Sequence, residues 1–196
     1  MKKYVIPAML IASLTFAACG NNQESTTETT GDTMQMGATS DATPGAAMTD
    51  TSNNQKDRDF VMEAASGGLM EVELGNLAQT NASSAAVKQF GQQMVTDHSK
   101  ANDELKSIAS AKNITIPTAP SGKHQDHINE LKSKKGAEFD KAYMSMMVDD
   151  HQEDVDKFQS EADNGNDAEI KAFAAKTVPI LKTHLELAKT TKDKVK

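Results

Sequence analysis

Four polar residues interrupt the apolar stripes of the long helical segments in this 196-residue chain. They are one carboxylate and three imidazoles, one in each segment: Glu71, His98, His151 and His184. Imidazole and carboxylate groups together suit Zn, Cu(II), Fe or Ni as ligands. Each residue lies near the middle of its segment, on the face that the apolar residues occupy. The pattern therefore predicts one mononuclear transition-metal site in the middle of a helical bundle, used to bind, buffer or sense the metal.

A structural alternative accounts for the same four residues. Buried polar groups need hydrogen-bond partners, and groups at one level of a bundle can supply one another. Such a polar layer fixes the register of the helices and needs no metal. The sequence leaves both interpretations open. The alternative function is a metal-free structural or stress-protective module that binds a protein partner through its helix faces.

The other polar residues near this set are expected to lie on the surface. Four acidic residues are expected on solvated helix faces, the alternative being that they hold the ligands in place: Glu73, Asp97, Asp149 and Asp150. His124 and His127 stand among polar neighbours, and we expect a solvated surface pair. No Ser-His-Asp motif, glycine-rich phosphate loop or catalytic-cysteine context is present. We therefore expect a non-enzymatic protein, and a metal-dependent redox enzyme is the alternative.

Four long helices must position these residues. Apolar residues recur at three- and four-residue steps, the spacing of amphipathic helices, over 57–80, 84–112, 137–164 and 167–194. Pro117 and Pro120 end the second helix, and a longer connector with a short helix near 123–134 leads to the third. Alternating β-branched runs are missing, so no strand pair is expected. The predicted fold class is all-α: a four-helix bundle of two helical hairpins joined by a long crossover with a short extra helix.

The direction of the crossover decides whether the four residues can meet. Glu71 lies roughly five residues, or about 7 Å, above the level of His98 at 1.5 Å per residue. If the crossover runs the length of the bundle, the second and third helices are parallel and His184 rises to the level of Glu71. If the crossover is local, Glu71 and His184 lie roughly 13 Å apart along the axis. The metal site therefore requires the long crossover.

The N-terminus has the features of an export signal. Two lysines precede an apolar stretch that is too short to span a bilayer. The string Phe-Ala-Ala-Cys that ends at Cys19 resembles a bacterial lipobox, although phenylalanine stands where leucine is usual. We therefore expect a lipoprotein-type signal peptide over residues 1–19, with an ordinary secretory signal as the alternative. Lipid on Cys19 would anchor the protein on the periplasmic side of the envelope, and we expect the outer membrane.

A polar segment follows the signal. Residues 20–56 contain no Val, Leu, Ile or aromatic residue and are rich in Thr, Asn and Gly. Such a segment cannot bury enough apolar surface to offset its chain entropy, so we expect a disordered tether. The predicted bundle domain then covers residues 57–196.

Charge and cysteine content exclude several classes of protein. The net charge of −7 disfavours binding to the nucleic-acid backbone, which is driven by clustered basic residues. The single cysteine excludes an internal disulfide framework and a cysteine-rich metal site. The membrane, reached through lipid on Cys19, is the partner that the sequence predicts, and no protein partner is specified.

Several strings along the domain are shared with a known bacterial family. They include Gly67-Gly68-Leu69-Met70-Glu71, the Asp-His pairs that end at His98 and His151, and Pro179 with His184-Leu185. Together they resemble the family called domain of unknown function 4142, over about residues 57–192. The resemblance implies an exported protein with a ferritin-like bundle, and it implies no established activity.

The histidine context separates this chain from ferritin-like di-iron enzymes, which use Glu-x-x-His motifs on two helices. Here Val95, Val148 and Leu181 stand three residues before the histidines. The carboxylate-rich ligand set of those enzymes is therefore missing. This leaves a mononuclear, histidine-rich site or no metal.

Overall fold

The computed structural model describes the backbone of residues 47–196 and the side chains of residues 55–196. In this part of the chain the fold is all-α, with five helices and no strand, as the sequence predicts. The helices are α1 (Ala47–Asn81), α2 (Ala85–Ala111), α3 (Lys123–Lys132), α4 (Gly136–Asn164) and α5 (Ala168–Lys194). The predicted signal peptide, Cys19 and the tether up to residue 46 lie outside the described residues.

The helix bounds follow the apolar periodicity closely, except at the start of α1. This helix begins at Ala47 rather than at residue 57, so it includes the last part of the segment expected to be a tether. Pro44 and Gly45 come just before it, and no proline or glycine lies between Ala47 and Gly67. Nothing in the sequence therefore stops the backbone hydrogen bonding of α1 from extending in the N-terminal direction.

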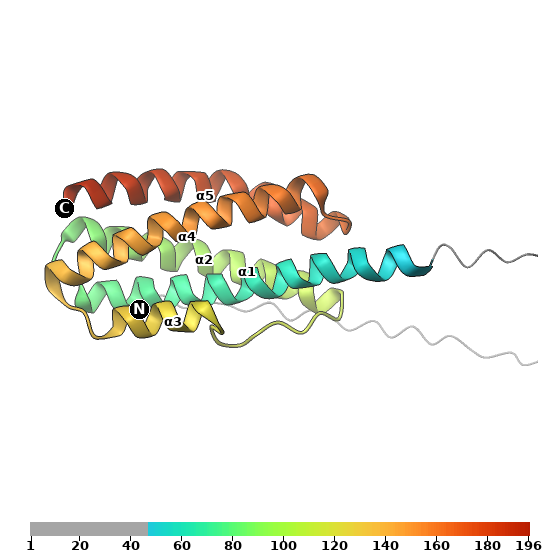
Figure 1. Cartoon of the computed structure of the whole chain (residues 1–196), viewed down its shortest axis with the longest axis horizontal. Coiled ribbons are helices and arrows are strands. Elements are labelled where there is room, and N and C mark those ends of the chain that lie inside the picture. The colour runs from blue at the N-terminus through green and yellow to red at the C-terminus, as the bar shows by residue number, and fades with distance from the viewer. Residues whose placement is uncertain (1–46) are drawn as a thin grey trace, which may run out of the picture. The chain divides into compact units, whose positions relative to one another are not determined.

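Side-chain contacts at the two ends of the bundle establish the directions of the helices. At one end, Asp140 near the start of α4 accepts hydrogen bonds from the backbone N–H groups of Ser83 and Ser84, just before α2, at 3.1 and 2.9 Å. At the other end, Lys112 after α2 forms an ion pair of 2.7 Å with Asp167, just before α5. Helices α2 and α4 therefore run parallel, and the connection that carries α3 spans the bundle from end to end (Figure 1).

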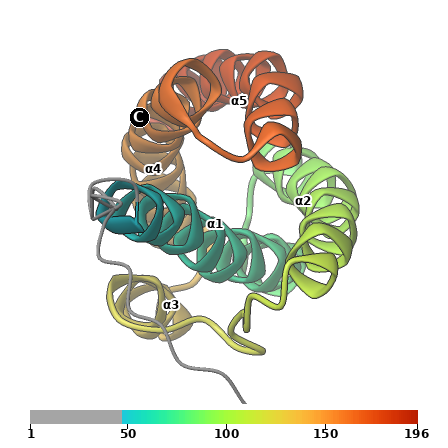
Figure 2. The same ribbon diagram turned by 90° about the vertical axis from the view of Figure 1, so that its right-hand side faces the viewer.

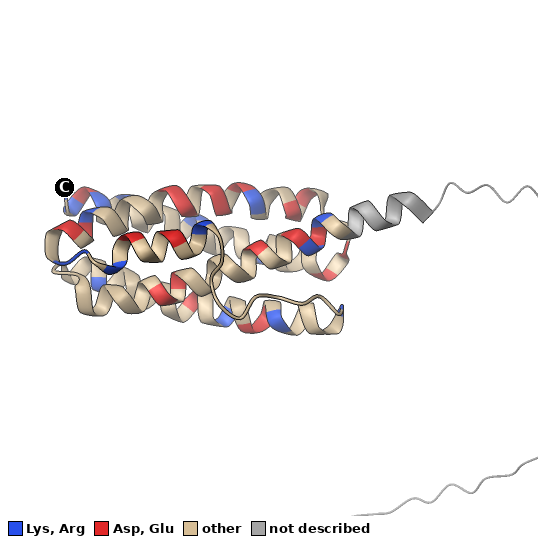
Figure 3. Cartoon of the chain, turned by 60° about the horizontal axis from the view of Figure 1, so that its bottom comes forward, with Lys and Arg blue, Asp and Glu red and all other residues tan. Residues whose placement is uncertain are grey.

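Viewed along their length, the four long helices surround a common core in the order α1, α2, α5, α4, so that α2 and α4 are diagonally opposite (Figure 2). Helix α3 packs on the outside, against α1 and α4. Acidic and basic residues are interspersed along the helices (Figure 3). Among the described residues, no helix combines the length and the apolar character that are needed to span a membrane.

The core consists of two apolar clusters with a polar layer between them. One cluster includes Phe90 and Tyr143, whose rings meet edge to face with centroids 5.9 Å apart, and the other includes Phe158 and Phe173. Burial of each large apolar side chain contributes roughly 1.5–3 kcal/mol. On α2 the two clusters are interrupted at His98. The clusters therefore hold the polar layer at a defined level of the bundle.

Helices α1 and α2 approach each other closely at two glycines. A Cβ atom on Gly75 would lie 2.5 Å from the carbonyl oxygen of Gly91, so no larger side chain fits at this spacing. The contact is one turn from Glu71 on α1 and two turns from His98 on α2. The close approach therefore brings the two polar residues into hydrogen-bonding range.

Candidate metal centre

The structure brings together the four residues that the sequence singled out. Glu71, His98, His151 and His184 lie on α1, α2, α4 and α5, and their exposed fractions are 1%, 7%, 0% and 1%. The imidazole centroids are 5.8 Å apart for His98 and His151, 5.3 Å for His98 and His184, and 5.4 Å for His151 and His184. One nitrogen from each of the three rings lies within 4.8 Å of the other two. We refer to His98, His151 and His184 as the histidine trio.

Each ring of the histidine trio is held by its outer nitrogen. His151 Nδ1 donates a hydrogen bond of 2.9 Å to the carbonyl oxygen of Met147. His184 Nε2 donates to Asp97 Oδ2, also at 2.9 Å. His98 Nδ1 lies 2.6 Å from Glu71 Oε2. These contacts set the orientation of all three rings, as partners of metal-binding histidines do.

The inner nitrogens of the trio lack hydrogen-bond partners. His98 Nε2, His151 Nε2 and His184 Nδ1 are buried and have no hydrogen-bond partner among the described residues. Because Nδ1 of His151 and Nε2 of His184 carry the ring proton, the inner nitrogen of each of these rings is a lone-pair donor. The contact between His98 and Glu71 gives His98 the same arrangement when the shared proton sits on nitrogen.

Glu71 lies between the trio and a second group of carboxylates. Its Oε1 is 3.2 Å from His151 Nε2, while its Oε2 contacts His98. Oxygens of Glu71, Asp150 and Asp154 all lie within 4.8 Å of one another. Glu71 is therefore in place to support His98 and to contact an ion from the α1 side.

Burial changes the ionisation of every group in the layer. It lowers the pKa of His98 to about 4. It also lowers the pKa of His184, and the charge of His98 lowers that pKa further. It lowers the pKa of His151 well below its ordinary value, with added effects from the other two histidines. Burial also raises the pKa of Glu71 well above its usual range, and the charge of Asp150 adds to this. The imidazoles are therefore neutral at neutral pH, which is the form that binds metal.

A pocket between α2 and α5 borders the histidine trio on one side. This pocket has a volume of about 250 Å³, and both His98 and His184 line it. Asp97, Glu104 and Lys176 lie at the same pocket. The pocket therefore ends next to two of the three rings, whose inner nitrogens are themselves buried.

Two of the four acids expected on solvated faces are placed differently by the structure. Asp97 contacts His184, and Asp150 is only 5% exposed. Glu73 and Asp149 are exposed, as expected. Asp97 and Asp150 each precede an inward-facing histidine, so they lie about 100° around the helix from it, at the edge of the buried face. The repeated Asp-His dipeptide could have indicated both placements, because the side chain of a residue at this edge can point toward a neighbouring helix.

The expectation of a solvated histidine pair on the connector is wrong for His124. This residue is 3% exposed, and its Nδ1 lies 2.8 Å from the hydroxyl oxygen of Ser66 on α1. Helix α3 packs back against α1, which periodicity in so short a segment does not specify. His127 is half-buried and lies outside the histidine trio.

Comparison with known proteins identifies the family. The family model described as "Domain of unknown function (DUF4142)" matches residues 42–191, so the chain belongs to this family, as its sequence strings suggested. No curated protein matches the chain.

Solved structures of other proteins share the fold at low sequence identity. The Cu(II)-bound form of CopM is 14% identical, with a TM-score of 0.60, and the match covers 70% of this chain and 96% of that one. A Streptomyces coelicolor protein of family DUF305, described as secreted, is 11% identical with a TM-score of 0.58, over 68% and 88% of the two chains. The conserved hypothetical protein rv2844 from Mycobacterium tuberculosis is 13% identical with a TM-score of 0.57, over 72% and 93%. Identities this low show a common helical fold.

Proposed function

We propose that the histidine trio binds one transition-metal ion and that this protein stores, buffers or senses the metal in the bacterial envelope. The observation that supports this most strongly is the set of three buried inner nitrogens without partners. A purely structural layer would be expected to pair these nitrogens with one another or with neighbouring groups. Instead the hydrogen bonds are confined to the outer nitrogens, and the inner ones converge, with Glu71 Oε1 lying 3.2 Å from His151 Nε2.

The donor set suits a borderline metal. Neutral imidazoles bind Zn, Cu(II), Ni and Fe. Ligands about 2.0–2.1 Å from a tetrahedral ion lie roughly 3.3 Å apart, and Glu71 Oε1 is 3.2 Å from His151 Nε2. Glu71 is thus proposed to take part in the site together with the trio. The pocket side of the ion remains open for exchange with solvent.

Copper is the first metal to test. The Cu(II)-bound form of CopM has a similar fold, although at 14% identity the likeness extends to the fold alone. Three imidazoles with an open position accept Cu(II) readily, because Cu(II) has the highest affinity of the divalent first-row metals for nitrogen ligands. Zn²⁺ is the natural comparison, since it binds the same ligands without redox chemistry.

The cellular setting is proposed from the N-terminal sequence. Lipid on Cys19 would hold a ferritin-like, non-enzymatic bundle at the periplasmic side of the envelope, at the outer membrane. The DUF305 protein of similar fold is described as secreted, which agrees with a place outside the cytoplasm. A long tether between anchor and bundle would let the domain sample the space near the membrane.

Elemental analysis of the purified, untagged chain after incubation with Cu(II) or Zn²⁺ tests the proposal. We expect one equivalent of metal, lost in the His98→Ala/His151→Ala variant and strongly reduced in His184→Gln. His124→Gln is the matched control, because His124 is a buried histidine outside the trio. Circular dichroism checks that each variant is folded. A folded wild-type chain that retains no metal would leave the polar layer with a structural role only.

A further inference from the structure

Three carboxylates lie together on the α1 and α4 side of the polar layer. Glu71 comes from α1, Asp150 and Asp154 come from α4, and one oxygen of each lies within 4.8 Å of the others. We call these residues the carboxylate trio. Burial raises the pKa of Asp150 and raises the pKa values of Glu71 and Asp154 well above their usual range. Glu71 and Asp150 are buried and Asp154 is half-buried, and ionised carboxylates this close together in such surroundings need a positive charge nearby.

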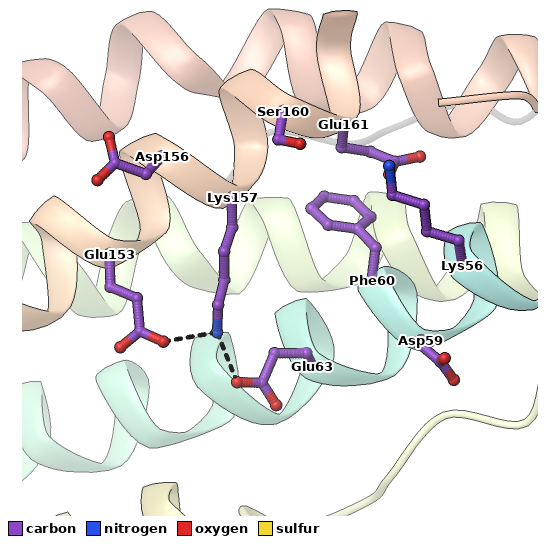
Figure 4. A pocket seen from close by; sticks show the side chains of 9 residues that line it. All are labelled: Lys56, Asp59, Phe60, Glu63, Glu153, Asp156, Lys157, Ser160 and Glu161. Atoms are coloured by element: carbon purple, nitrogen blue, oxygen red, sulfur yellow. Dashed lines mark hydrogen bonds and ion pairs between the residues drawn. The ribbon is translucent and has the colours of Figure 1, made fainter. Parts of the chain in front are cut away.

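The lysines beside the carboxylate trio are already paired with other acids. Lys123 and Lys157 lower the pKa of Asp154 only through their distant charges. Both form ion pairs with Glu63 and Glu153, at 2.6–3.4 Å. Figure 4 shows Lys157 between these two glutamates. Because two lysines and two glutamates balance each other, the described residues provide no ion pair with Lys or Arg for the trio.

The carboxylate trio also has open coordination positions. Glu71 Oε1 and Asp150 Oδ2 are buried, and neither has a hydrogen-bond partner among the described residues. A cavity of about 20 Å³ adjoins the trio at Glu71 and Asp154, and His98, Gly67 and Gly68 also line it. That volume holds one water-sized group. The two glycines contribute no side chain to fill it.

We propose that the carboxylate trio binds a second ion, a hard divalent cation of the Mn²⁺, Mg²⁺ or Ca²⁺ type, beside the histidine trio. Carboxylate oxygens are the ligands that such cations prefer, and water completes their coordination shells. Glu71 lies between the two sites and is shared by them. The second site does not require the first to be filled, because Asp150 and Asp154 form no hydrogen bond or ion pair with the histidine trio.

The alternative occupants of this space are protons, which would neutralise the carboxylates without any cation. Titration of the purified chain with Mn²⁺, followed by the loss of the electron paramagnetic resonance signal of aqueous Mn²⁺, separates the two cases. Asp154→Asn and Asp150→Asn remove one ligand each while keeping the shape of the side chain. Asp156→Asn is the matched control, because Asp156 is an exposed residue on the same helix. His184→Gln tests independence from the histidine trio.

We expect one saturable Mn²⁺ site, weakened at least about tenfold in Asp154→Asn and Asp150→Asn and unchanged in Asp156→Asn. His184→Gln should keep the Mn²⁺ site while its binding of the transition metal is strongly reduced. A wild-type chain without saturable Mn²⁺ binding, or an Asp154→Asn variant that binds like wild type, would overturn the proposal. Loss of Mn²⁺ binding in folded His184→Gln would also overturn it, since there would then be one shared site. Mn²⁺ binding without any uptake of Cu(II) or Zn²⁺ would refute the proposed function and leave this inference standing.

A second readout locates the ion. Tyr143 is buried on α4, two turns before Asp150, and it is the single tyrosine among the described residues of a chain that has no tryptophan. Tb³⁺ prefers oxygen ligands, and nearby tyrosine sensitises its luminescence. Excitation of tyrosine should therefore give Tb³⁺ emission in wild type and no emission in Tyr143→Phe. Added Mn²⁺ should compete with Tb³⁺ for the site and lower the emission. Emission that survives Asp154→Asn unchanged would place the ion elsewhere and overturn the assignment.

Discussion

Binding of a transition metal to the histidine trio should release the proton of Glu71. In the metal-free protein, burial raises the pKa of Glu71 well above its usual range and lowers the pKa of His98 to about 4. At neutral pH both groups are then neutral, and Glu71 donates its proton across the 2.6 Å contact to His98 Nδ1. In that state His98 carries its own proton on Nε2, the nitrogen that faces the other histidines.

A metal ion needs His98 Nε2 as a lone pair. The ring proton must therefore move to Nδ1, where it is donated to Glu71, and the carboxyl proton of Glu71 must leave. The balance is one proton released for each metal ion bound. Because a proton is released, the metal affinity depends on pH. At pH values below the pKa of Glu71, each increase of one pH unit raises the affinity tenfold, or by about 1.4 kcal/mol.

Glu71→Gln removes this proton and the negative charge that supports His98. We expect metal affinity to fall roughly 10–100-fold, the usual cost of losing such a partner. Stability should change in the opposite direction. An acid whose pKa is raised on folding binds more protons in the folded state, so it destabilises the protein as pH rises above its ordinary value of 4.5. Metal-free Glu71→Gln should therefore resist urea better than wild type at pH 8.

Isothermal titration calorimetry with Zn²⁺ at pH 7, in buffers of different protonation enthalpy, measures the proton count. Wild type should release one proton per ion, and Glu71→Gln should release none. Glu73→Gln is the matched control, because Glu73 is exposed on the same helix and should leave the count unchanged. If wild type releases no proton, or if Glu71→Gln releases as many as wild type, the proposed protonation of the His98 contact is wrong.

Four further predictions concern stability and attachment. Folding lowers the pKa of His98 from 6.5 to about 4, so the metal-free protein should lose up to roughly 3 kcal/mol of unfolding free energy as the pH drops through that range. Urea titrations of wild type and His98→Gln at several pH values measure the contribution of His98. Gly75→Ala places a Cβ 2.5 Å from the Gly91 oxygen and should cost about 1–3 kcal/mol in urea unfolding. Asp140→Ala leaves two backbone N–H groups before α2 without their acceptor and should cost about 1–3 kcal/mol by the same assay; full retention of stability would contradict the role of Asp140 in the crossover. Cys19→Ser should move the protein out of the membrane fraction, and an unmodified mature N-terminus found elsewhere by mass spectrometry would contradict the lipid anchor.

The long helices were predictable because their apolar stripes are long and regular. The predicted ranges 84–112, 137–164 and 167–194 differ from α2, α4 and α5 by a residue at most at each end. The histidine trio was predictable for the same reason, since a polar residue in place of an apolar one stands out against a regular stripe. Packing of the stripes then brought the four residues to one level, without further information from local sequence.

The carboxylate trio could not be predicted in this way. Asp150 and Asp154 lie off the stripe, next to inward-facing residues, and on a solvent-facing helix such positions are usually exposed. Whether they are buried depends on how far α4 is rotated against α1, and the packing of side chains in both apolar clusters decides that rotation. Periodicity in one helix carries no information on its rotation relative to a neighbour.

The same dipeptide, Asp-His, has different surroundings on α2 and α4, and the topology explains why. Helices α2 and α4 run parallel and lie diagonally opposite in the bundle (Figure 2). An aspartate one residue before an inward-facing histidine is rotated in the same sense on both helices. Because the helices are diagonal, that rotation points Asp97 toward α5 and Asp150 toward α1. Asp97 therefore contacts His184 and orients a ring of the histidine trio, whereas Asp150 lies beside Glu71, which leaves two buried carboxylates to be neutralised by a proton or by a cation. A connection from α2 to α4 that did not span the bundle would have made these helices antiparallel and would have reversed the rotation on one of them.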